Sequence, residues 1–239
     1  MTLNLSAPTQ AITSNVTIPI NSLNGTGPYT YSVKVGGIGG TIDSNGNYTS
    51  PNALGTDTII ITDSLANSGQ LLINVLHPID LVCDIIQREL DLAQGRVFLY
   101  NQKIKQPVDN NLFVVIQVLN SKAFSNTNRP LASVSGLNAE ASINMQTTLS
   151  IDIKSRGIDA LYRKEEVLMA LNSDYAQQQQ MINAFYVAKT ATNFVNLSEL
   201  DGSAIPYRFN ISVNIQYVAG KIKSVPYYDN FENVEITTN

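Results

Sequence analysis

Groups that transfer protons or activate nucleophiles at neutral pH are scarce in this sequence. Its single histidine is His77 and its single cysteine is Cys83. A Ser-His-Asp triad or a multi-histidine metal site would require His77 to act alone in a linker, and one cysteine cannot form an internal disulfide or a cysteine-based zinc site. We therefore interpret His77 as a structural residue of a hinge and Cys83 as a small apolar residue packed on a helix.

Two polar clusters in the first third of the chain could bind ions. The glycines at 36, 37, 39 and 40 could cradle a phosphate, but neither a Lys-Ser or Lys-Thr pair nor a helix start follows them. Asp43, Asn45 and Asn47 offer alternate oxygen ligands for calcium, without the bidentate Glu of a calcium loop. Turns between strands are the favoured interpretation of both clusters.

A pair of adjacent acids is the remaining candidate for catalysis. Glu165 and Glu166 are neighbours on a predicted helix, so they point about 100° apart and cannot converge on one substrate bond. A polysaccharide hydrolase would need such paired acids in a cleft. We expect no enzymatic activity, no catalytic residue, no cofactor and no metal ion.

Composition limits the partners. The 239 residues are 44% hydrophobic and 14% charged, against about 25% charged in typical soluble domains. The net charge of -4 argues against a basic face that grips phosphates. Residues 1–6 lack the basic and apolar regions of a signal peptide, and no run reaches the roughly 18 apolar residues of a membrane span. We expect synthesis in a cytoplasm and no membrane contact.

Residues 1–78 have the pattern of a small β-sandwich. Apolar residues alternate with polar ones in two runs, at Val16, Ile18 and Ile20, and at Tyr29, Tyr31, Val33 and Val35. Further strands are expected at 59–62 and 71–76. Residues 43–46 (DSNG) provide the Asn and Gly that a tight turn requires.

The stretch GTIDSNGNYTSP at 40–51, followed by GTDTI at 55–59, resembles bacterial and phage immunoglobulin-like repeats. The order of turn, tyrosine, proline and closing strand carries this resemblance, which covers about a third of the chain. It implies an immunoglobulin-like β-sandwich over residues 1–78. The cysteine pair and core tryptophan of antibody domains are absent.

The pattern changes after His77-Pro78, since proline interrupts a strand ladder but suits a helix start. A helix is expected over 79–92, with Ile79, Val82, Ile86 and Leu90 on its apolar stripe and Gly95 as its stop. Strands are expected at 112–119, 145–153 and 207–217, and helices at 159–171 and 174–185. This order predicts an α+β domain over 79–239, an antiparallel sheet with helices packed on one face.

The second half resembles the neck or tail terminator family of tailed phages, whose members join the tail to the head. The resemblance spans about 79–231 and rests on the first helix, the segment YNQ at 100–102, the strand and polar turn at 146–157, the helix pair, and a closing strand followed by VPYYD at 225–229. It implies a non-catalytic structural protein of the virion at the head-to-tail junction. It also implies a homo-oligomeric ring with six-fold or twelve-fold symmetry, in contact with neighbouring neck, tail and portal proteins. DNA would pass through the channel of this ring without sequence-specific binding. The immunoglobulin-like module would be an outward decoration.

Three segments are expected to make contacts between subunits. Aromatic residues near the end of the sequence are the candidate interface: Tyr217, Tyr227, Tyr228 and Phe231. The alternative is that this tail folds back over its own core. A polar loop at 122–137 is long enough to reach a neighbour, and the glutamines at 177–180 form a polar helix face that could do the same.

Two other functions stay open at this point. The first half could be an adhesion module that binds a glycan on the host surface. Another tail or head-completion protein would have the same order of elements, and ring size, neighbours and tail length do not follow from the sequence.

Overall fold

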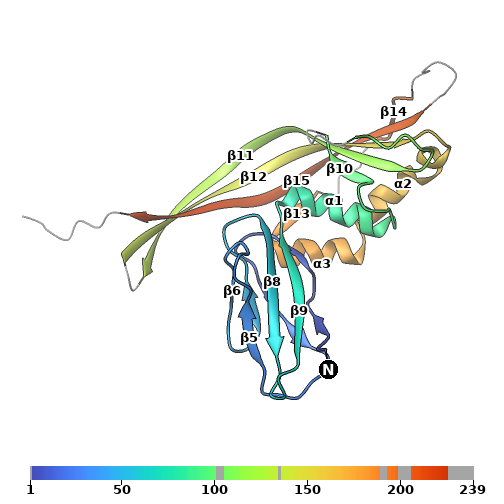
Figure 1. Cartoon of the computed structure of the whole chain (residues 1–239). Coiled ribbons are helices and arrows are strands. Elements are labelled where there is room, and N and C mark those ends of the chain that lie inside the picture. The colour runs from blue at the N-terminus through green and yellow to red at the C-terminus, as the bar shows by residue number, and fades with distance from the viewer. Residues whose placement is uncertain (1, 101–104, 134–135, 189–192, 199–205, 226–239) are drawn as a thin grey trace, which may run out of the picture.

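The computed structural model describes residues 2–100, 105–133, 136–188, 193–198 and 206–225 (Figure 1). Within these ranges the chain is mostly β-strand, arranged in several sheets, with three short helices. Two large apolar cores divide it into a β-rich fold of two domains. One core lies among the strands of the first 75 residues, and the other lies between a long sheet and the helices.

The N-terminal module consists of short strands. They are β1 (Leu5–Ser6), β2 (Ala11–Ile12), β3 (Thr17–Pro19), β4 (Asn21–Ser22), β5 (Thr30–Val33), β6 (Thr41–Ile42), β7 (Asn47–Thr49), β8 (Gly55–Thr62) and β9 (Ser68–Val75). One sheet has the order β2-β9-β8-β5, a second has the order β3-β7-β6, and β1 pairs with β4. The expected alternation is confirmed at Ile18 and Ile20, which are buried. It is wrong at Val35, which is 98% exposed because β5 ends at Val33 and the chain enters the glycine-rich loop.

Two hairpin turns of this module have the same pattern of hydrogen bonds. Asp43 accepts hydrogen bonds from the backbone N–H groups of Asn45 and Asn47 at 2.9 and 2.8 Å, and from the Asn47 side chain. In the turn between β8 and β9, Asp63 accepts from the backbone and the side chain of Asn67 in the same way. The Asp43 carboxylate is therefore occupied in closing a turn, as the preference for a turn over a calcium loop requires.

The C-terminal domain is built on one long sheet. Its elements are α1 (Pro78–Glu89), β10 (Val97–Leu99), β11 (Phe113–Ser133), β12 (Gly136–Ser155), α2 (Asp159–Leu171), α3 (Asp174–Asn183), β13 (Phe185–Val187), β14 (Val195–Asn196) and β15 (Tyr207–Val225). The sheet has the order β10-β11-β12-β15-β13, and β14 pairs with the start of β15. Apolar residues of the helices and of one sheet face form a single core, so the helices pack on one face as predicted.

Several sequence predictions for this domain need correction. The pair β10 and β11 is parallel, because the chain crosses back between residues 99 and 113 before entering β11. Helix α3 ends at Asn183, and Phe185 starts strand β13, because Ala184 takes a left-handed conformation. Residues 122–133 and 136–137, expected in a loop, belong to the paired strands β11 and β12. Helix α1 ends at Glu89, and Gly95 lies in the following turn.

The start of α1 explains the role of His77. Its Nδ1 atom accepts a hydrogen bond from the backbone N–H of Ile79 at 3.3 Å, and Pro78 takes the first helical position. His77 is therefore the N-cap of α1, which satisfies one of the unpaired N–H groups of a helix start. None of the helices in the described parts of the chain is long and apolar enough to cross a membrane.

Candidate assembly surfaces

Strands β11, β12 and β15 extend well past the helices (Figure 1). We call residues 118–133, 136–145 and 217–225 the arm. With 21 residues, β11 is roughly 65 Å long at about 3.3 Å per residue. The sequence did not predict the arm, because residues 117–128 are all exposed and no buried face marks this part of β11. The register of the arm is given by the cross-strand pairs of β11 with β12 and of β12 with β15.

The arm presents apolar side chains to solvent. The register of β11 against β12 shifts at Leu119 and again at Phe124, each an extra residue without a partner on β12. These two side chains are 54% and 55% exposed, and Val218 on β15 is 56% exposed. Bulges increase strand twist and redirect side chains, so they place these groups on the outside of the arm.

Both long edges of the arm lack a partner strand among the described residues. Strand β10 covers the edge of β11 only as far as Ile116, and β13 covers the edge of β15 between Ile215 and Tyr217. Beyond these points no described strand pairs with the outer edges of β11 and β15, although the Gly220 carbonyl on β15 accepts from the Asn52 side chain. Such edges template association between chains.

The N-terminal module is joined to helix α3 by buried polar contacts. The backbone N–H of Thr13 donates to Oδ1 of Asn183 at 2.7 Å, and the Thr13 hydroxyl donates to the Asn183 carbonyl at 3.2 Å. Asn183 in turn donates to Gln179, which is fully buried. The prediction of a solvated polar helix face is therefore wrong at Gln179, because α3 turns this side chain toward the contact with the module.

A crevice of about 440 Å³ lies beside this contact, between the module and the arm. Tyr217 lines it, and its ring meets the His77 ring edge-on with the centroids 5.0 Å apart. Burial lowers the pKa of His77, against the opposing effect of the Asp80 charge. The Asn52 side chain donates to the Gly220 carbonyl at 3.5 Å. Tyr217 is thus half-buried at the base of the arm.

Of the four aromatic residues predicted to form an interface between subunits, the structure describes only Tyr217. Tyr217 pairs with Met145 on β12 and with Phe185 on β13, so it anchors the arm to the domain. Its role between subunits stays a prediction. Tyr227, Tyr228 and Phe231 lie outside the described residues.

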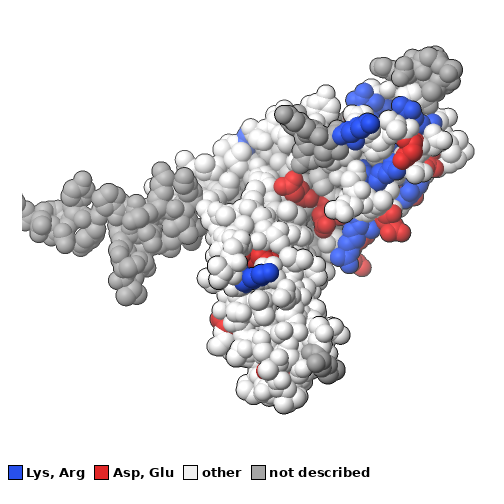
Figure 2. Space-filling view, in the orientation of Figure 1, with Lys and Arg blue, Asp and Glu red and all other residues white. Residues whose placement is uncertain are grey.

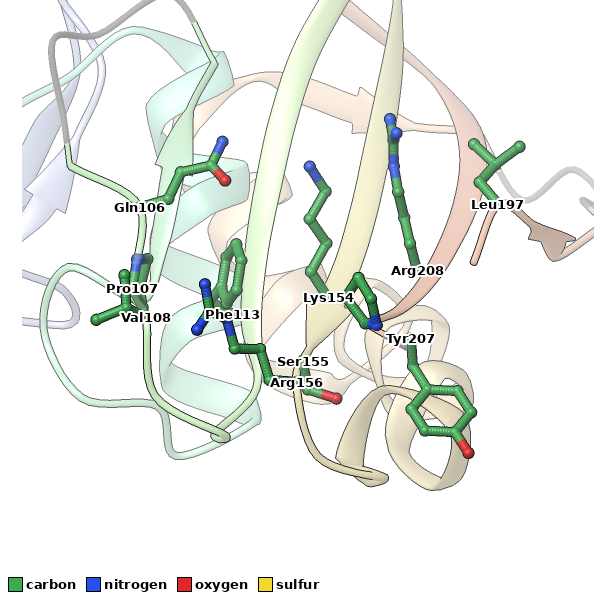
Figure 3. A pocket seen from close by; sticks show the side chains of 11 residues that line it. Gln106, Pro107, Val108, Phe113, Lys154, Ser155, Arg156, Leu197, Tyr207 and Arg208 are labelled. Carbon is green, nitrogen blue, oxygen red and sulfur yellow. The ribbon is translucent and has the colours of Figure 1, made fainter. Parts of the chain in front are cut away.

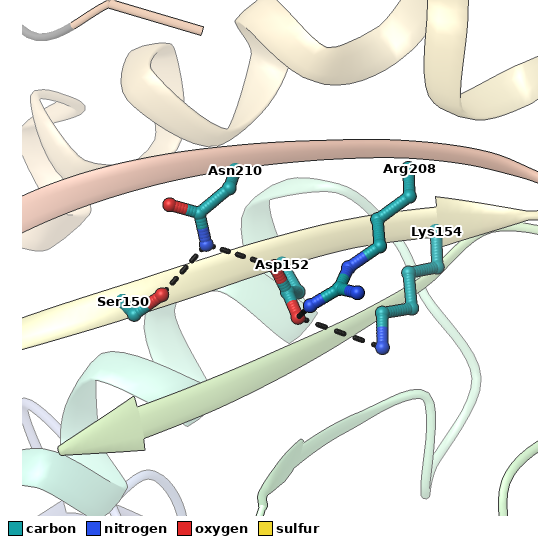
Figure 4. Close-up of polar contacts among 5 residues, drawn as sticks. All are labelled: Ser150, Asp152, Lys154, Arg208 and Asn210. Atoms are coloured by element: carbon teal, nitrogen blue, oxygen red, sulfur yellow. Dashed lines mark hydrogen bonds and ion pairs between the residues drawn. The ribbon is translucent and has the colours of Figure 1, made fainter. Parts of the chain in front are cut away.

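The sheet face opposite the helices carries a polar network near the start of β15 (Figure 4). Asp152 accepts from Arg208 at 2.8 Å, and the Lys154 ammonium lies 3.5 Å from the same carboxylate oxygen. Asn210 donates to the other carboxylate oxygen and to the hydroxyl of Ser150. Cross-strand register between β12 and β15 brings these side chains together from positions more than 50 residues apart.

A pocket of about 510 Å³ opens at the end of this network (Figure 3). Lys154 and Arg208 extend side by side from β12 and β15, and Arg156 lies just beyond the end of β12. The described residues that line it are Gln106, Pro107, Val108, Phe113, Lys154, Ser155, Arg156, Leu197, Pro206, Tyr207 and Arg208. No acidic residue is among them, so the pocket is suited to an anionic group.

Charge is unevenly distributed over the molecule. On the face in Figure 2, Lys, Arg, Asp and Glu side chains gather on the part of the C-terminal domain that carries the helices, while the module shows few of them. Residues 1–76 contain only Lys34, Asp43, Asp57 and Asp63 as charged side chains. The module therefore offers a polar, weakly charged surface.

Groups that could perform catalysis are dispersed. Among the described residues, no three His, Cys, Asp or Glu side chains lie close enough together to hold a metal ion. Burial raises the pKa of the Cys83 thiol to about 12, which keeps it protonated at neutral pH. Asp57 is fully buried and accepts hydrogen bonds from the loop at 36–40, so the glycines cradle a carboxylate of their own chain.

No protein-family model matches this sequence, and a search of curated proteins likewise finds no match.

Proposed function

We propose that this chain is a structural protein of a tailed-phage virion that forms a homo-oligomeric ring at the junction of head and tail. The observation that carries the proposal is the arm, with its open edges and its exposed Leu119, Phe124 and Val218. Ring formation is its function, DNA passes through the channel without sequence-specific binding, and neighbouring neck, tail and portal proteins stack on the ring. No catalytic step is part of this role.

An isolated arm lacks part of the support that stabilises a β-ribbon. A ribbon of β-strands is stable when one face packs on a core or when its edges are paired. Residues 117–128 are exposed, and in the described chain only their inner edge is paired, with β12. Contact with a neighbouring subunit would cover the exposed apolar side chains and pair the open edges.

A ring follows if the contacts are heterologous, so that the arm of one subunit lies on a different surface of the next and the rotation closes. The arm leaves the domain in one direction, well clear of the helices, which favours a neighbour on that side (Figure 1). The order of α1, the sheet and the helix pair α2 and α3 supports the resemblance to neck and tail terminators.

The N-terminal module enters the proposal as an immunoglobulin-like decoration. Its two principal sheets and the buried Tyr48 between the strands support an immunoglobulin-like sandwich. The bonds between Thr13 and Asn183 fix the module against α3, so it would project from each subunit in one orientation.

The test is the mass and shape of the purified chain near physiological salt. Light scattering should give six or twelve times the 26.0 kDa of one chain, and negative-stain electron microscopy should show rings with knobs at their periphery. A single-chain mass at all concentrations, alone and when mixed with purified phage heads or tails, contradicts the proposal.

A further inference from the structure

The cationic pocket is built by one row of cross-strand neighbours. Phe113 on β11 pairs with Lys154 on β12, which pairs with Arg208 on β15. The backbone N–H of Leu197 donates to the Arg208 carbonyl at 2.8 Å and extends the row on the far side of β15. Like charges directly opposite each other destabilise a sheet, so the pair of Lys154 and Arg208 has a cost that needs a compensating anion.

The described chain supplies only part of that compensation. Asp152 is shared between Lys154 and Arg208, and Arg156 forms no ion pair within the part of the chain that the structure describes. The Nε atom of Arg208 is shielded from solvent and has no hydrogen-bond partner among the described residues. Among the described residues, Arg208 thus presents an unused donor and Arg156 an unpaired charge, beside a pocket whose described lining contains no acid.

The same chain contains a segment of opposite charge. Residues 226–239 carry Asp229, Glu232 and Glu235 and no Lys or Arg. Aromatic residues precede and separate these acids, namely Tyr227, Tyr228 and Phe231. The pocket pairs its cations with apolar lining from Val108, Phe113 and Leu197, which complements a segment that alternates acidic and aromatic side chains.

Chain length separates this segment from the pocket of its own subunit. Arg208 is near the first residue of β15 and Val225 is its last, so seventeen residues, roughly 55 Å, lie between them. Glu235 is ten residues beyond Val225, and ten residues span at most about 36 Å when fully extended. The acidic side chains therefore fall short of their own pocket and can reach that of another copy.

We propose that residues 226–239 of one subunit bind in the pocket formed by Lys154, Arg156 and Arg208 of the next, with the acidic side chains on the cations and the aromatic rings on Phe113 and Val108. This inference rests on the proposed ring and specifies the contact between its neighbouring subunits. The pocket and the segment lie at opposite ends of β15, so the contact is heterologous and runs in one direction around the ring.

The direct test is binding of a fluorescent peptide of sequence 226–239 to the full chain. The receptor is the variant Asp229→Asn, Glu232→Gln, Glu235→Gln, whose own segment is neutral. Anisotropy should report saturable binding that weakens as salt is raised. Arg156→Glu should reduce the affinity about tenfold or more, as should Arg208→Gln, while Lys34→Glu in the module should leave it unchanged. Arg156 makes no described ion pair, so its variant tests the pocket without disturbing the sheet.

A mixing experiment tests whether the contact joins two copies. The pocket variant (Arg156→Glu with Arg208→Gln) keeps its segment, and the segment variant above keeps its pocket. Each alone should assemble poorly, and the mixture should gain two-chain complexes, since one productive contact remains. If both variants form the same rings as the unmodified chain, the inference is overturned and the proposed function is left intact.

The peptide measurement also separates the inference from the ring. Saturable binding lost in Arg156→Glu supports the pocket contact even if the unmodified chain is monomeric. No binding of the peptide at low salt overturns it. Binding of a double-stranded DNA oligonucleotide, sensitive to Arg156→Glu, in place of the peptide also overturns it, because the pocket then serves phosphates.

Discussion

The phenol of Tyr48 donates a 2.7 Å hydrogen bond to Oδ2 of Asp57, and both side chains are fully buried in the N-terminal module. The same carboxylate accepts from the backbone N–H groups of Ile38 and Gly40, each at 2.8 Å. Burial, followed by the bond to Asp57, raises the pKa of Tyr48 above its ordinary value. This arrangement closes the glycine-rich loop over the core.

Removing the Tyr48 hydroxyl tests this relationship. Tyr48→Phe keeps the ring but deletes one donor to a buried carboxylate, so we expect a loss of about 1–3 kcal/mol in the free energy of unfolding, measured by urea denaturation. Tyr31→Phe is the matched control, because the Tyr31 ring is partly exposed and should tolerate the loss of its hydroxyl. Equal stability of the two variants would contradict the assigned role of the bond.

Gly40 should be required for steric reasons. A Cβ atom at this position would lie 2.5 Å from Asp57 Oδ2 and 2.5 Å from the Tyr48 ring. Gly40→Ala must displace one of these buried groups, and overpacking typically costs about 1–3 kcal/mol. Thermal unfolding should show a clear drop in Tm, whereas Gly220→Ala, whose Cβ would meet its nearest neighbour at 3.9 Å, should behave like the unmodified chain.

The two aspartate turns should make stability depend on pH. Hydrogen bonds, chiefly from the side chains of Asn47 and Asn67, hold the pKa values of Asp43 and Asp63 below their ordinary value. A depressed folded-state pKa adds stability above the unfolded pKa of about 3.9, and this contribution is lost as the pH falls through the folded pKa. The stability difference between the unmodified chain and Asp43→Asn with Asp63→Asn should therefore shrink on acidification from about pH 6 to about pH 3. A difference that stays constant over this range would contradict the assignment.

The arm should matter for assembly and little for folding. Leu119→Ser with Phe124→Ser removes apolar side chains that are more than half exposed, so we expect the unfolding transition to stay within about 0.5 kcal/mol while ring formation falls. Light scattering reports the assembly and urea denaturation reports the folding. Leu65→Ser in the module, where Leu65 is 68% exposed, is the control that should still assemble.

The joint between the domains should depend on Asn183. Asn183→Ala leaves the buried N–H of Thr13 without its acceptor, at a cost of about 1–3 kcal/mol. Because this bond joins the module to α3, the variant should also become sensitive to limited proteolysis near residues 76 and 77. Asn172→Ala is a control, because the exposed Asn172 side chain donates, among the described residues, only to the Leu168 carbonyl at the end of α2. If Asn183→Ala resists proteolysis as well as the control does, the joint between the domains is held by its apolar contacts.

Elements with one buried face were predictable from sequence. The alternation from Tyr207 to Tyr217 predicted the first half of β15, and α2 has the predicted bounds Asp159–Leu171. Hydrophobic periodicity reports burial, so it succeeds where one face of a strand or helix packs on a core. The turn at 43–46 was also predictable, because Asp, Asn and Gly form such turns through their own hydrogen bonds and backbone freedom and need no distant contacts.

Tertiary structure alone decided the rest. The sequence by itself predicted a β-sandwich part followed by an α+β part, with few groups suited to catalysis. The arm was not predicted because residues 117–128 are exposed throughout, so no alternation of buried and exposed positions marks this strand, and its pairing with β12 is made by backbone bonds that side-chain patterns do not encode. The parallel pairing of β10 and the burial of Gln179 depend on how distant elements meet. The cationic pocket likewise exists because strand register aligns Phe113, Lys154 and Arg208, and register between strands this far apart in the chain is a property of the folded sheet.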